Sequence, residues 1–478
     1  MQVPPKPLLT SGFILQAEVQ PGRIADVRIA AGVIEAMGSF VPGAGDWSVN
    51  ARGGALLPGL HDHHLHLFSL AASLSSIDCA GHGTLTAQAF AALLRSRATP
   101  ATSRWLRVVS YHESIAGDLD RHWLDQMVPH APVRVQHRSG RLWVLNSQAL
   151  RMVQGDADEQ SMPGERLAGQ HTGRFYDADP WMRTRTATGM PPLREVSELL
   201  SSWGVTAVTD ASPGNGKAEF DHFVSEREQG HLLQEVLVMG GDSLWHQQPR
   251  SGVSAGPRKF HHHEGSLPDF DVFLDQIRAA HAQGRPIAVH CVTLSELVFT
   301  LAALQQAGPL AGDRIEHASV VSPEAMSMMA ALGVAVVTQP NFVQERGDAY
   351  VAAVESDEQP WLYRLRSLAA RGIPLGGGTD APFGRPNPWT AMEAAVRRRS
   401  RGGIVLGIEE ALTPEEALAM FAGEPSAPGG PARRIEVGAP ANLCLLDRPW
   451  GSARDALSHV RVAATVHAFD TSRPRCYI

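Results

Sequence analysis

The chain has 478 residues, and 42 Lys and Arg against 49 Asp and Glu give a net charge of −7. Hydrophobic residues make up 44 % and charged residues 19 %, which is the composition of a globular protein and not of a disordered chain. The sequence is mildly acidic and has no basic stripe, so we expect no nucleic-acid partner. A chain of this length needs neither a metal ion nor a disulfide merely to hold its fold.

The apolar runs and the cysteines predict a protein of the reducing cytoplasm. No apolar run reaches the roughly 18 residues of a membrane span, so no membrane partner is expected. The first residues contain a single Lys and early prolines and lack the apolar segment of a signal peptide. The four cysteines are scattered and form no CxxC motif; they are Cys79, Cys291, Cys444 and Cys476.

Short segments of alternating polarity, broken by Gly and Pro, predict β-strands at both ends of the chain. They cover residues 12–19, 25–30 and 32–38 near the start, and 441–447 and 459–469 near the end. Because chain ends often lie close together, we predict that residues 1–54 and 430–478 form one small β-sandwich domain. Two independent β caps are the alternative.

Between the ends, eight apolar runs alternate with helical stretches, which predicts the α/β class. The helical stretches include residues 271–283, 294–306 and 323–332. We predict a (β/α)₈ TIM barrel over residues 55–429, with its chemistry where the strands end. The eight candidate strands are residues 54–61, 205–210, 234–240, 257–262, 285–290, 313–318, 334–339 and 373–380.

The first and second of these strands are far apart in the sequence, which predicts a long insertion over about residues 70–195. It holds a helical stretch after Thr84, strand-like runs at 106–111 and 131–137, and a Gly- and Asp-rich region at 155–179. Long insertions at the catalytic end of a barrel usually cover or shape the site.

Five of the predicted strands carry side chains that bind metal ions, at or near their ends. Two histidines at i and i+2 of an extended segment point to the same side and can bind one ion. Neutral imidazoles and a carboxylate suit divalent ions, zinc first among them. The candidate ligands are His64, His66, Lys259, His290, His317 and Asp380.

Several motifs resemble those of the amidohydrolase superfamily of metal-dependent hydrolases. PGLHDHHLHL is similar to the opening "PG-x-x-D-x-H-x-H", and AVHCVT, RIEHASVV and LGGGTDAP are similar to the later metal strands. VQHRSGRLWVLNSQAL, GERLAGQHTGRFYD and GVTAVTDAS resemble the branch that contains N-substituted formamide deformylase and YtcJ-like amidohydrolases. VGAPANLCLLD is similar to the terminal "G-x-x-ADL-x-x-LD" segment, with Asn442 in place of the usual Asp.

The resemblance implies a role for each candidate ligand. The first histidine pair would bind the more buried ion, and His290 and His317 would bind a second one. Lys259 matches a lysine that CO₂ carboxylates, so that it bridges two ions, and Asp380 would ligate metal or carry the proton of the attacking water. If Lys259 stays unmodified, a single ion would be held by His64, His66, His290 and Asp380.

Other residues near these motifs leave alternatives open. Arg141 stands where branch relatives carry His, and its guanidinium would favour an anionic group on the substrate. Asp210 either contacts substrate or caps the turn after its strand. The three histidines at 261–263 are either polar residues at the end of their strand or supply a further metal ligand. Cys291 is interpreted as a small buried residue rather than a nucleophile.

Together these features predict a metal-dependent hydrolase that cleaves a non-peptide carbon–nitrogen bond in an amide or N-acyl amine. Asp380 is the catalytic residue, the cofactor is one or two divalent ions, and the partner is a small-molecule substrate, with a homo-oligomer as a further expectation. A deaminase of an amino-substituted ring is the first alternative, although its usual Glu is matched poorly by Glu296. A non-catalytic binding or regulatory protein is the second.

Overall fold

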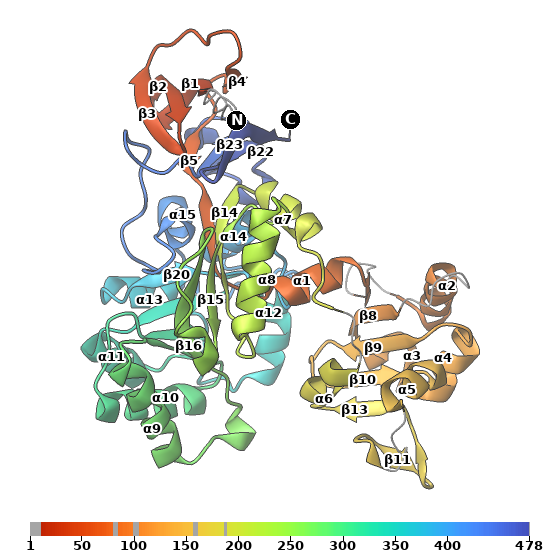
Figure 1. Cartoon of the computed structure of the whole chain (residues 1–478). Helices are drawn as coiled ribbons and strands as arrows, with labels where there is room; N and C mark the ends of the chain where they lie inside the picture. The colour runs from red at the N-terminus through yellow and green to blue at the C-terminus, as the bar shows by residue number, and fades with distance from the viewer. Residues whose placement is uncertain (1–10, 80–84, 99–104, 156–160, 186–188, 478) are drawn as a thin grey trace, which may run out of the picture. The chain divides into compact units, whose positions relative to one another are not determined.

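The computed structural model describes residues 11–79, 85–98, 105–155, 161–185 and 189–477 (Figure 1). The chain forms two compact units, one made of Met1–Leu67 with Pro192–Ile478 and the other of Phe68–Pro191. The first unit contains an eight-stranded sheet with its helices and two smaller sheets, and the second contains a five-stranded sheet and a two-stranded one. The domain boundaries predicted from the sequence stay predictions.

The eight-stranded sheet confirms the predicted barrel. Its strands follow one another in sequence order, and every neighbouring pair is parallel. Since parallel strands are covered on both faces, they read as nearly continuous apolar runs. The strands are β6 (Leu60–Leu65), β14 (Val205–Asp210), β15 (Glu235–Gly240), β16 (Val253–Phe260), β17 (Ile287–Cys291), β18 (Arg314–His317), β19 (Ala335–Thr338) and β20 (Leu375–Gly377).

Helices lie on the outside of this sheet (Figure 1). Their starts follow from local sequence: Thr293 and Glu296 form a capping box, and Ser322 caps a helix that begins with Pro323. The helices are α7 (Arg194–Ser201), α8 (Lys217–Glu228), α9 (Phe270–Ala282), α10 (Leu294–Ala307), α11 (Pro323–Leu332), α12 (Asn341–Ala353), α13 (Leu365–Ala370), α14 (Pro388–Arg397) and α15 (Pro414–Ala422), and the short α16 (Trp450–Ala453) comes later in the chain. Another helix, α1 (Leu67–Leu74), follows β6.

The last strand of the barrel meets the first one just beyond Gly377. The amide of Asp380 donates to the carbonyl of His64 (2.8 Å), and the amide and hydroxyl of Thr379 donate to the Asp62 carboxylate. A Cβ at Gly378 would lie 2.5 Å from the Cβ of His64, so a glycine is needed for the two segments to approach. The closure therefore places Asp380 beside the histidines of β6.

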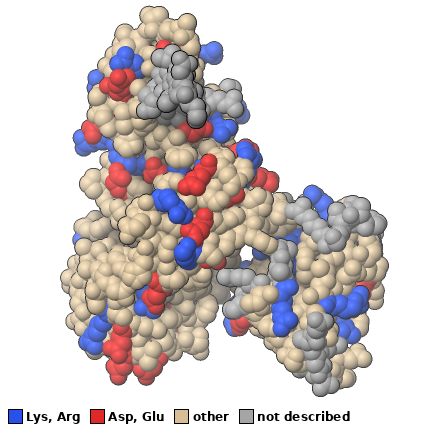
Figure 2. Space-filling view, viewed as in Figure 1, with Lys and Arg blue, Asp and Glu red and all other residues tan. Residues whose placement is uncertain are grey.

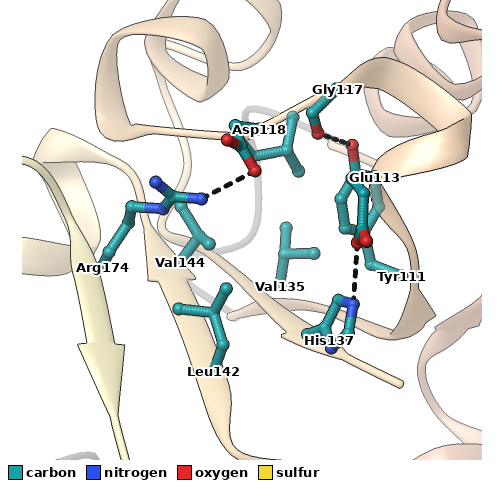
Figure 3. A pocket seen from close by; sticks show the side chains of 10 residues that line it. Tyr111, Glu113, Gly117, Asp118, Val135, His137, Leu142, Val144 and Arg174 are labelled. Carbon is teal, nitrogen blue, oxygen red and sulfur yellow. Dashed lines mark hydrogen bonds and ion pairs between the residues drawn. The ribbon is translucent and has the colours of Figure 1, made fainter. Parts of the chain in front are cut away.

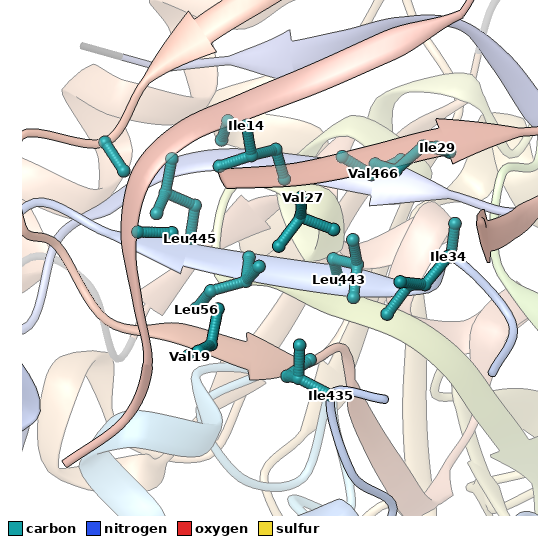
Figure 4. Close-up of a cluster of buried hydrophobic side chains, with 14 residues drawn as sticks. Ile14, Val19, Val27, Ile29, Ile34, Leu56, Ile435, Leu443, Leu445 and Val466 are labelled. Carbon is teal, nitrogen blue, oxygen red and sulfur yellow. The ribbon is translucent and has the colours of Figure 1, made fainter. Parts of the chain in front are cut away.

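Both chain ends contribute to one β-sandwich, as the sequence predicted. Its hydrophobic core combines side chains from both ends, among them Ile14, Val27 and Ile34 with Leu443 and Val466 (Figure 4). Two independent caps are thereby excluded. One sheet contains β1 (Gly12–Gln20), β2 (Arg23–Ala30), β3 (Val33–Gly38) and β4 (Trp47–Asn50), and the other contains β5 (Leu56–Pro58), β21 (Leu443–Leu446), β22 (Val462–His467) and β23 (Asp470–Cys476).

The predicted first barrel strand, residues 54–61, is divided between two sheets. Its first part, β5, pairs with β21 of the sandwich, and β6 begins two residues later in the barrel. Gly59 lies at the crossing point, where a Cβ would come within 2.3 Å of the Thr206 side chain. The crossing therefore needs a residue without a side chain.

The insertion forms a sheet of its own. The predicted strands at 106–111 and 131–137 are β8 and β9, and the helical stretch after Thr84 is α2. Asn146 is fully buried and bonds to the backbone of Val128, Ala131 and Val133, which fixes the turn before α5. The elements are β7 (Ile77–Asp78), α2 (Ala87–Arg97), β8 (Leu106–Tyr111), α3 (Glu113–Ala116), α4 (Arg121–Met127), β9 (Val133–His137), β10 (Leu142–Leu145), α5 (Ser147–Gln154), β11 (Arg166–Leu167), β12 (Gln170–His171), β13 (Arg174–Tyr176) and α6 (Asp179–Arg185).

No helix in the described ranges is long and apolar enough to cross a membrane. On the face shown in Figure 2, acidic and basic side chains alternate over the surface, and the described residues of that face form no broad basic patch.

The structure shows how the amide side chain of Asn442, which stands where the resembled terminal segment has Asp, is used. The Asn442 side chain accepts a bond from the Ala468 amide (2.8 Å) and donates through Nδ2 to Glu235 (3.0 Å). We expect Asn442→Asp to lower the thermal midpoint at neutral pH, because two carboxylates would then face each other at a cost of about 1–3 kcal/mol. Adding Glu235→Gln should restore much of the loss, and an Asp variant that melts with the parent would contradict this explanation.

Candidate metal centre

The carboxyl ends of the barrel strands bring the predicted ligands together. His64 lies near the end of β6 and His66 directly follows it. His290 and His317 lie at the ends of the paired strands β17 and β18, and Asp380 follows β20. Since the sheet closes between β20 and β6, residues from opposite ends of the barrel sequence become neighbours.

Three of the ligand atoms form a compact group. One carboxylate oxygen of Asp380, Oδ1, lies 3.2 Å from His66 Nε2 and 3.5 Å from His64 Nε2. All three atoms lie within 4.8 Å of one another, so a single ion could contact each of them. His64 and Asp380 are buried and His66 is half-buried.

The remaining histidines extend this group along the strand ends. The ring centroid of His317 lies 4.8 Å from that of His64 and 4.4 Å from that of His290. Lys259 on β16 is buried, and its Nζ has no hydrogen-bond partner among the described residues. Burial lowers the pKa of the Lys259 amine, while the carboxylates of Glu316 and Asp380 act in the opposite direction.

Hydrogen bonds on the far side of three imidazoles leave the near side free for a metal ion. His64 Nδ1 bonds to Glu316, His66 Nδ1 lies 2.9 Å from Ser212 Oγ, and His317 Nδ1 lies 2.7 Å from Gln339 Oε1. A carboxylate or amide oxygen accepts the Nδ1 proton, which puts the Nε2 lone pair toward the ion. The donor set therefore fits a divalent metal ion.

Glu316 is the residue that the sequence analysis missed. It is fully buried, and it joins His64 to Arg314, whose Nε donates to Glu316 Oε1 at 2.5 Å. Burial alone would raise the pKa of Glu316, but Arg314, Lys259 and His64 outweigh it and hold that pKa well below its usual value. The available signal was an acidic and a basic residue on either side of Ile315 in the predicted strand that ends near His317.

The backbone is strained at the same place. His317, Ala318 and Asp380 have φ values of 69°, 47° and 54°, in the left-handed region that non-glycine residues rarely adopt. Such strain costs of order 1–3 kcal/mol per residue and persists where surrounding structure enforces it, often at functional sites. Two of the three residues are candidate ligands.

Asp210 and Arg141, the predicted substrate contacts, have partners within the chain. Asp210 is fully buried and accepts hydrogen bonds from the amides of Leu67 and Ser212 and from Asn215, which favours the turn-capping alternative. Arg141 lies in the insertion unit, and its guanidinium pairs with both oxygens of Asp177. Its side chain is 65 % exposed.

Successive side chains of a strand point to opposite sides, and the residues next to the candidate ligands follow this alternation. His61 and His63 are fully buried and stack on each other at 4.2 Å, away from the ligand group. The ring of His261 lies 4.1 Å from that of His290, so this histidine borders the site. Cys291 is buried against Thr300, and burial raises the pKa of its thiol to about 12, as expected of a packing residue.

A second group of possible ligands lies in the insertion unit, at the hollow drawn in Figure 3. Glu113 contacts Nε2 of both His112 (3.3 Å) and His137 (3.0 Å). Each of these histidines accepts a backbone N–H at Nδ1, from Ser114 and Ser139, so the proton sits on Nε2 and faces Glu113. This proton arrangement is the reverse of the one in the barrel and disfavours a metal ion.

A (β/α)₈ barrel with histidines and an aspartate at its strand ends is typical of metal-dependent hydrolases. The sequence pattern of the Amidohydrolase family matches residues 48–468. The chain belongs to the amidohydrolase family, and it is therefore a hydrolase of the class that acts on carbon–nitrogen bonds. The resemblance seen in the motifs is confirmed.

Individual relatives are similar over most of their length. N-substituted formamide deformylase of Arthrobacter pascens is 26 % identical over 94 % of this chain and 92 % of its own. The putative amidohydrolase YtcJ of Bacillus subtilis is 23 % identical over 87 % of this chain and 89 % of its own. The structure of a metal-dependent hydrolase of Pyrococcus horikoshii has a TM-score of 0.77 at 18 % identity, over 94 % of this chain and 99 % of that one, and shows the same fold.

Proposed function

We propose that this chain hydrolyses a non-peptide amide or N-acyl amine with the help of one or two divalent ions, zinc first among them. The observation that carries the proposal is the convergence of His64, His66 and Asp380, with the Nε2 atoms of both histidines directed at the Asp380 carboxylate. The similarity to N-substituted formamide deformylase makes N-substituted formamides the first compounds to test.

The candidate ligands divide into two groups. His64, His66 and Asp380 would hold one ion, and His290 and His317 would hold a second, with Lys259 between them. Bound there, a divalent ion supplies a Lewis acid that acidifies water and polarises a carbonyl. A free ammonium repels cations, so Lys259 serves as a ligand only as the carboxylated anion, which forms from the neutral amine that burial favours.

Asp380 is the proposed proton carrier. Its carboxylate is buried, and Oδ1 lies 3.2 Å from His66 Nε2 and 3.5 Å from His64 Nε2. That oxygen would take a proton from the attacking water and deliver it to the leaving amine. The amide of Asp380, bonded to the His64 carbonyl, holds the carboxylate in place during the transfer.

The deaminase alternative lacks support at the residue that it needs. The Glu296 carboxylate accepts bonds from the amides of Glu264, Val292 and Thr293, which cap the start of α10. It is thus occupied in holding the helix. A non-catalytic protein would not need an open set of converging ligands, so the hydrolase is the better proposal.

Product analysis tests the reaction. Metal-loaded protein is given N-substituted formamides, other N-acyl amines and amino-substituted rings. The proposal predicts an amine and a carboxylic acid in equal amounts. Free ammonia with a carbonyl product would replace it by the deaminase, and no turnover of any compound by fully loaded protein would favour the binding protein.

Elemental analysis tests the metal centre. Protein purified without chelators should contain close to two ions per chain, and Lys259→Ala should lose part of them because the bridge is gone. Lys217→Ala is a matched control, since that lysine is exposed and pairs with Asp221. One ion in the parent, unaffected by Lys259→Ala, would instead indicate a mononuclear site.

The proposal also includes a cytoplasmic location and a small-molecule substrate. The cysteines Cys79, Cys291, Cys444 and Cys476 are all free, which supports a reducing compartment. A homo-oligomer remains a prediction that light scattering of the purified protein would test.

A further inference from the structure

The helix α12, which follows β19, is bonded to the loop that carries Asp380. A second helix, α13, lies between α12 and β20 in the sequence. Because α12 follows the carboxyl end of β19, it begins at the end of the barrel where the candidate ligands lie. Three hydrogen bonds connect its first two turns to residues 379–385: Asn341 to the Thr379 carbonyl (3.1 Å), the Arg385 amide to Glu345 (3.1 Å), and Arg346 to the Phe383 carbonyl (2.8 Å).

Arg346 is the basic residue of this helix and has no acidic partner. Its guanidinium lies 3.8 Å from the ring centroid of Phe342 and also meets the hydroxyl of Tyr350. Among the described residues, its contacts are with Phe342, Phe383 and Tyr350, none of them an ion pair, and the side chain is exposed. An arginine offers five N–H donors, so the contacts with Phe383 and Tyr350 leave donors free.

Phe383 connects Arg346 to the candidate ligands. The Phe383 ring lies edge-on to that of His66 at 5.5 Å and is 45 % exposed. The Phe383 amide donates to the Asp380 carbonyl at 2.8 Å, which folds the loop into a tight turn. Phe383 therefore contacts Arg346 through its carbonyl and the candidate ligand His66 through its ring.

We infer that Arg346 binds an anionic group of the substrate, a carboxylate in the first instance. The substrate class is then an amide or N-acyl amine that carries a carboxylate a few bonds from the scissile carbon–nitrogen bond. A planar guanidinium can bind a carboxylate through two parallel hydrogen bonds. The Phe342 ring holds the Arg346 guanidinium in place before the substrate binds. Arg141 is less suited to this role because the carboxylate of Asp177 already pairs with its guanidinium through Nε and Nη2. The inference rests on the proposed function for the reaction that follows binding.

Matched substrates test the inference. N-formyl-β-alanine and N-formylpropylamine differ in a carboxylate, and N-propylsuccinamic acid and N-propylbutyramide place the same difference on the acyl side. We expect metal-loaded parent protein to prefer the acid in at least one pair. In Arg346→Met the ratio of kcat/KM for acid over neutral compound should fall by about 10- to 100-fold, the loss of a hydrogen-bonded charge pair.

The controls separate binding from a structural role. Arg385→Met removes an exposed guanidinium from the same loop and should leave the ratio unchanged. If Arg346 only holds the loop through the Phe383 carbonyl, Arg346→Met will reduce both rates equally and the ratio will not move, which overturns the inference. A parent without preference in either pair overturns it as well.

Calorimetric titration separates failure of the inference from failure of the proposed function. If metal-loaded parent hydrolyses none of the four compounds, their binding to parent and Arg346→Met is measured directly. Tighter binding of an acid that is lost in the variant supports the anion site although the reaction is another one. Equal or undetectable binding of acid and neutral compound overturns the site.

Discussion

Replacing Asp380 by Asn is expected to lower kcat by about 10²- to 10⁴-fold, the usual contribution of a positioned acid–base group. Asn has the same shape but cannot take up the proton of the attacking water. The loop should keep its conformation, because the bond from the residue 380 amide to the His64 carbonyl does not involve the side chain. The measurement is kcat at saturating metal, with the thermal midpoint and the metal content of the same sample.

Asp313→Asn provides the matched control for this experiment. Asp313 is also buried, but it immediately precedes β18, at the opposite end of the barrel, and accepts bonds from the amides of Ile287 and Leu310. Its replacement should lower the thermal midpoint and leave kcat near that of the parent. Parent-like turnover in a fully metal-loaded Asp380→Asn protein would remove Asp380 from the proton transfer.

Replacing Glu316 by Gln is expected to produce the largest loss of stability, together with weaker metal binding. The substitution leaves the Arg314 guanidinium buried without its counter-charge, and breaking a buried ion pair in this way costs about 3–5 kcal/mol. It also weakens the acceptor that orients His64, and loss of such partners typically lowers metal affinity by about 10- to 100-fold. Thermal melting of metal-free protein and a metal titration measure the two effects separately.

A double variant distinguishes the two parts of the Glu316 effect. Arg314→Met together with Glu316→Gln removes both charges, so the thermal midpoint should recover in part. Metal affinity should stay low, because the partner of His64 Nδ1 is still a neutral amide. If Glu316→Gln melts with the parent, or if the double variant is less stable than the single one, the buried charge pair is not what holds this strand.

The fold and the grouping of the candidate ligands could be predicted because the signals for both lie in short stretches of sequence. Most of the barrel strands are short and rich in apolar residues, and the histidines at 290 and 317 at the ends of β17 and β18 mark these strands as carriers of candidate ligands. Parallel strands all end on the same side of a barrel, so the convergence of His64 and Asp380 needed only the strand count. Arg346 lacked such a signal, since nothing in the sequence shows that its helix packs on the Asp380 loop.

The features that the sequence could not show depend on contacts between distant segments. Glu316 acts on His64, 252 positions away, and the bond exists only because the barrel is closed. The division of residues 54–61 follows from pairing with β21, which is formed near the far end of the chain. The sequence could not decide whether Asp210 contacts substrate or caps a turn, because its hydrogen-bond donors Leu67 and Asn215 come from separate turns.

The short connection between β5 and β6 limits how the barrel of this enzyme can be moved into another protein. Only Gly59 separates β5 of the terminal sandwich from β6, the strand that carries His64, so the first strand of the barrel is joined directly to the sandwich. Trimming the chain to the barrel would remove β21, the strand that pairs with β5. The start of β6 would then no longer be held by the sandwich. A transplanted barrel must therefore carry both chain ends with it, and a library of chimaeras should place its junctions in the surface loops between helices and strands instead.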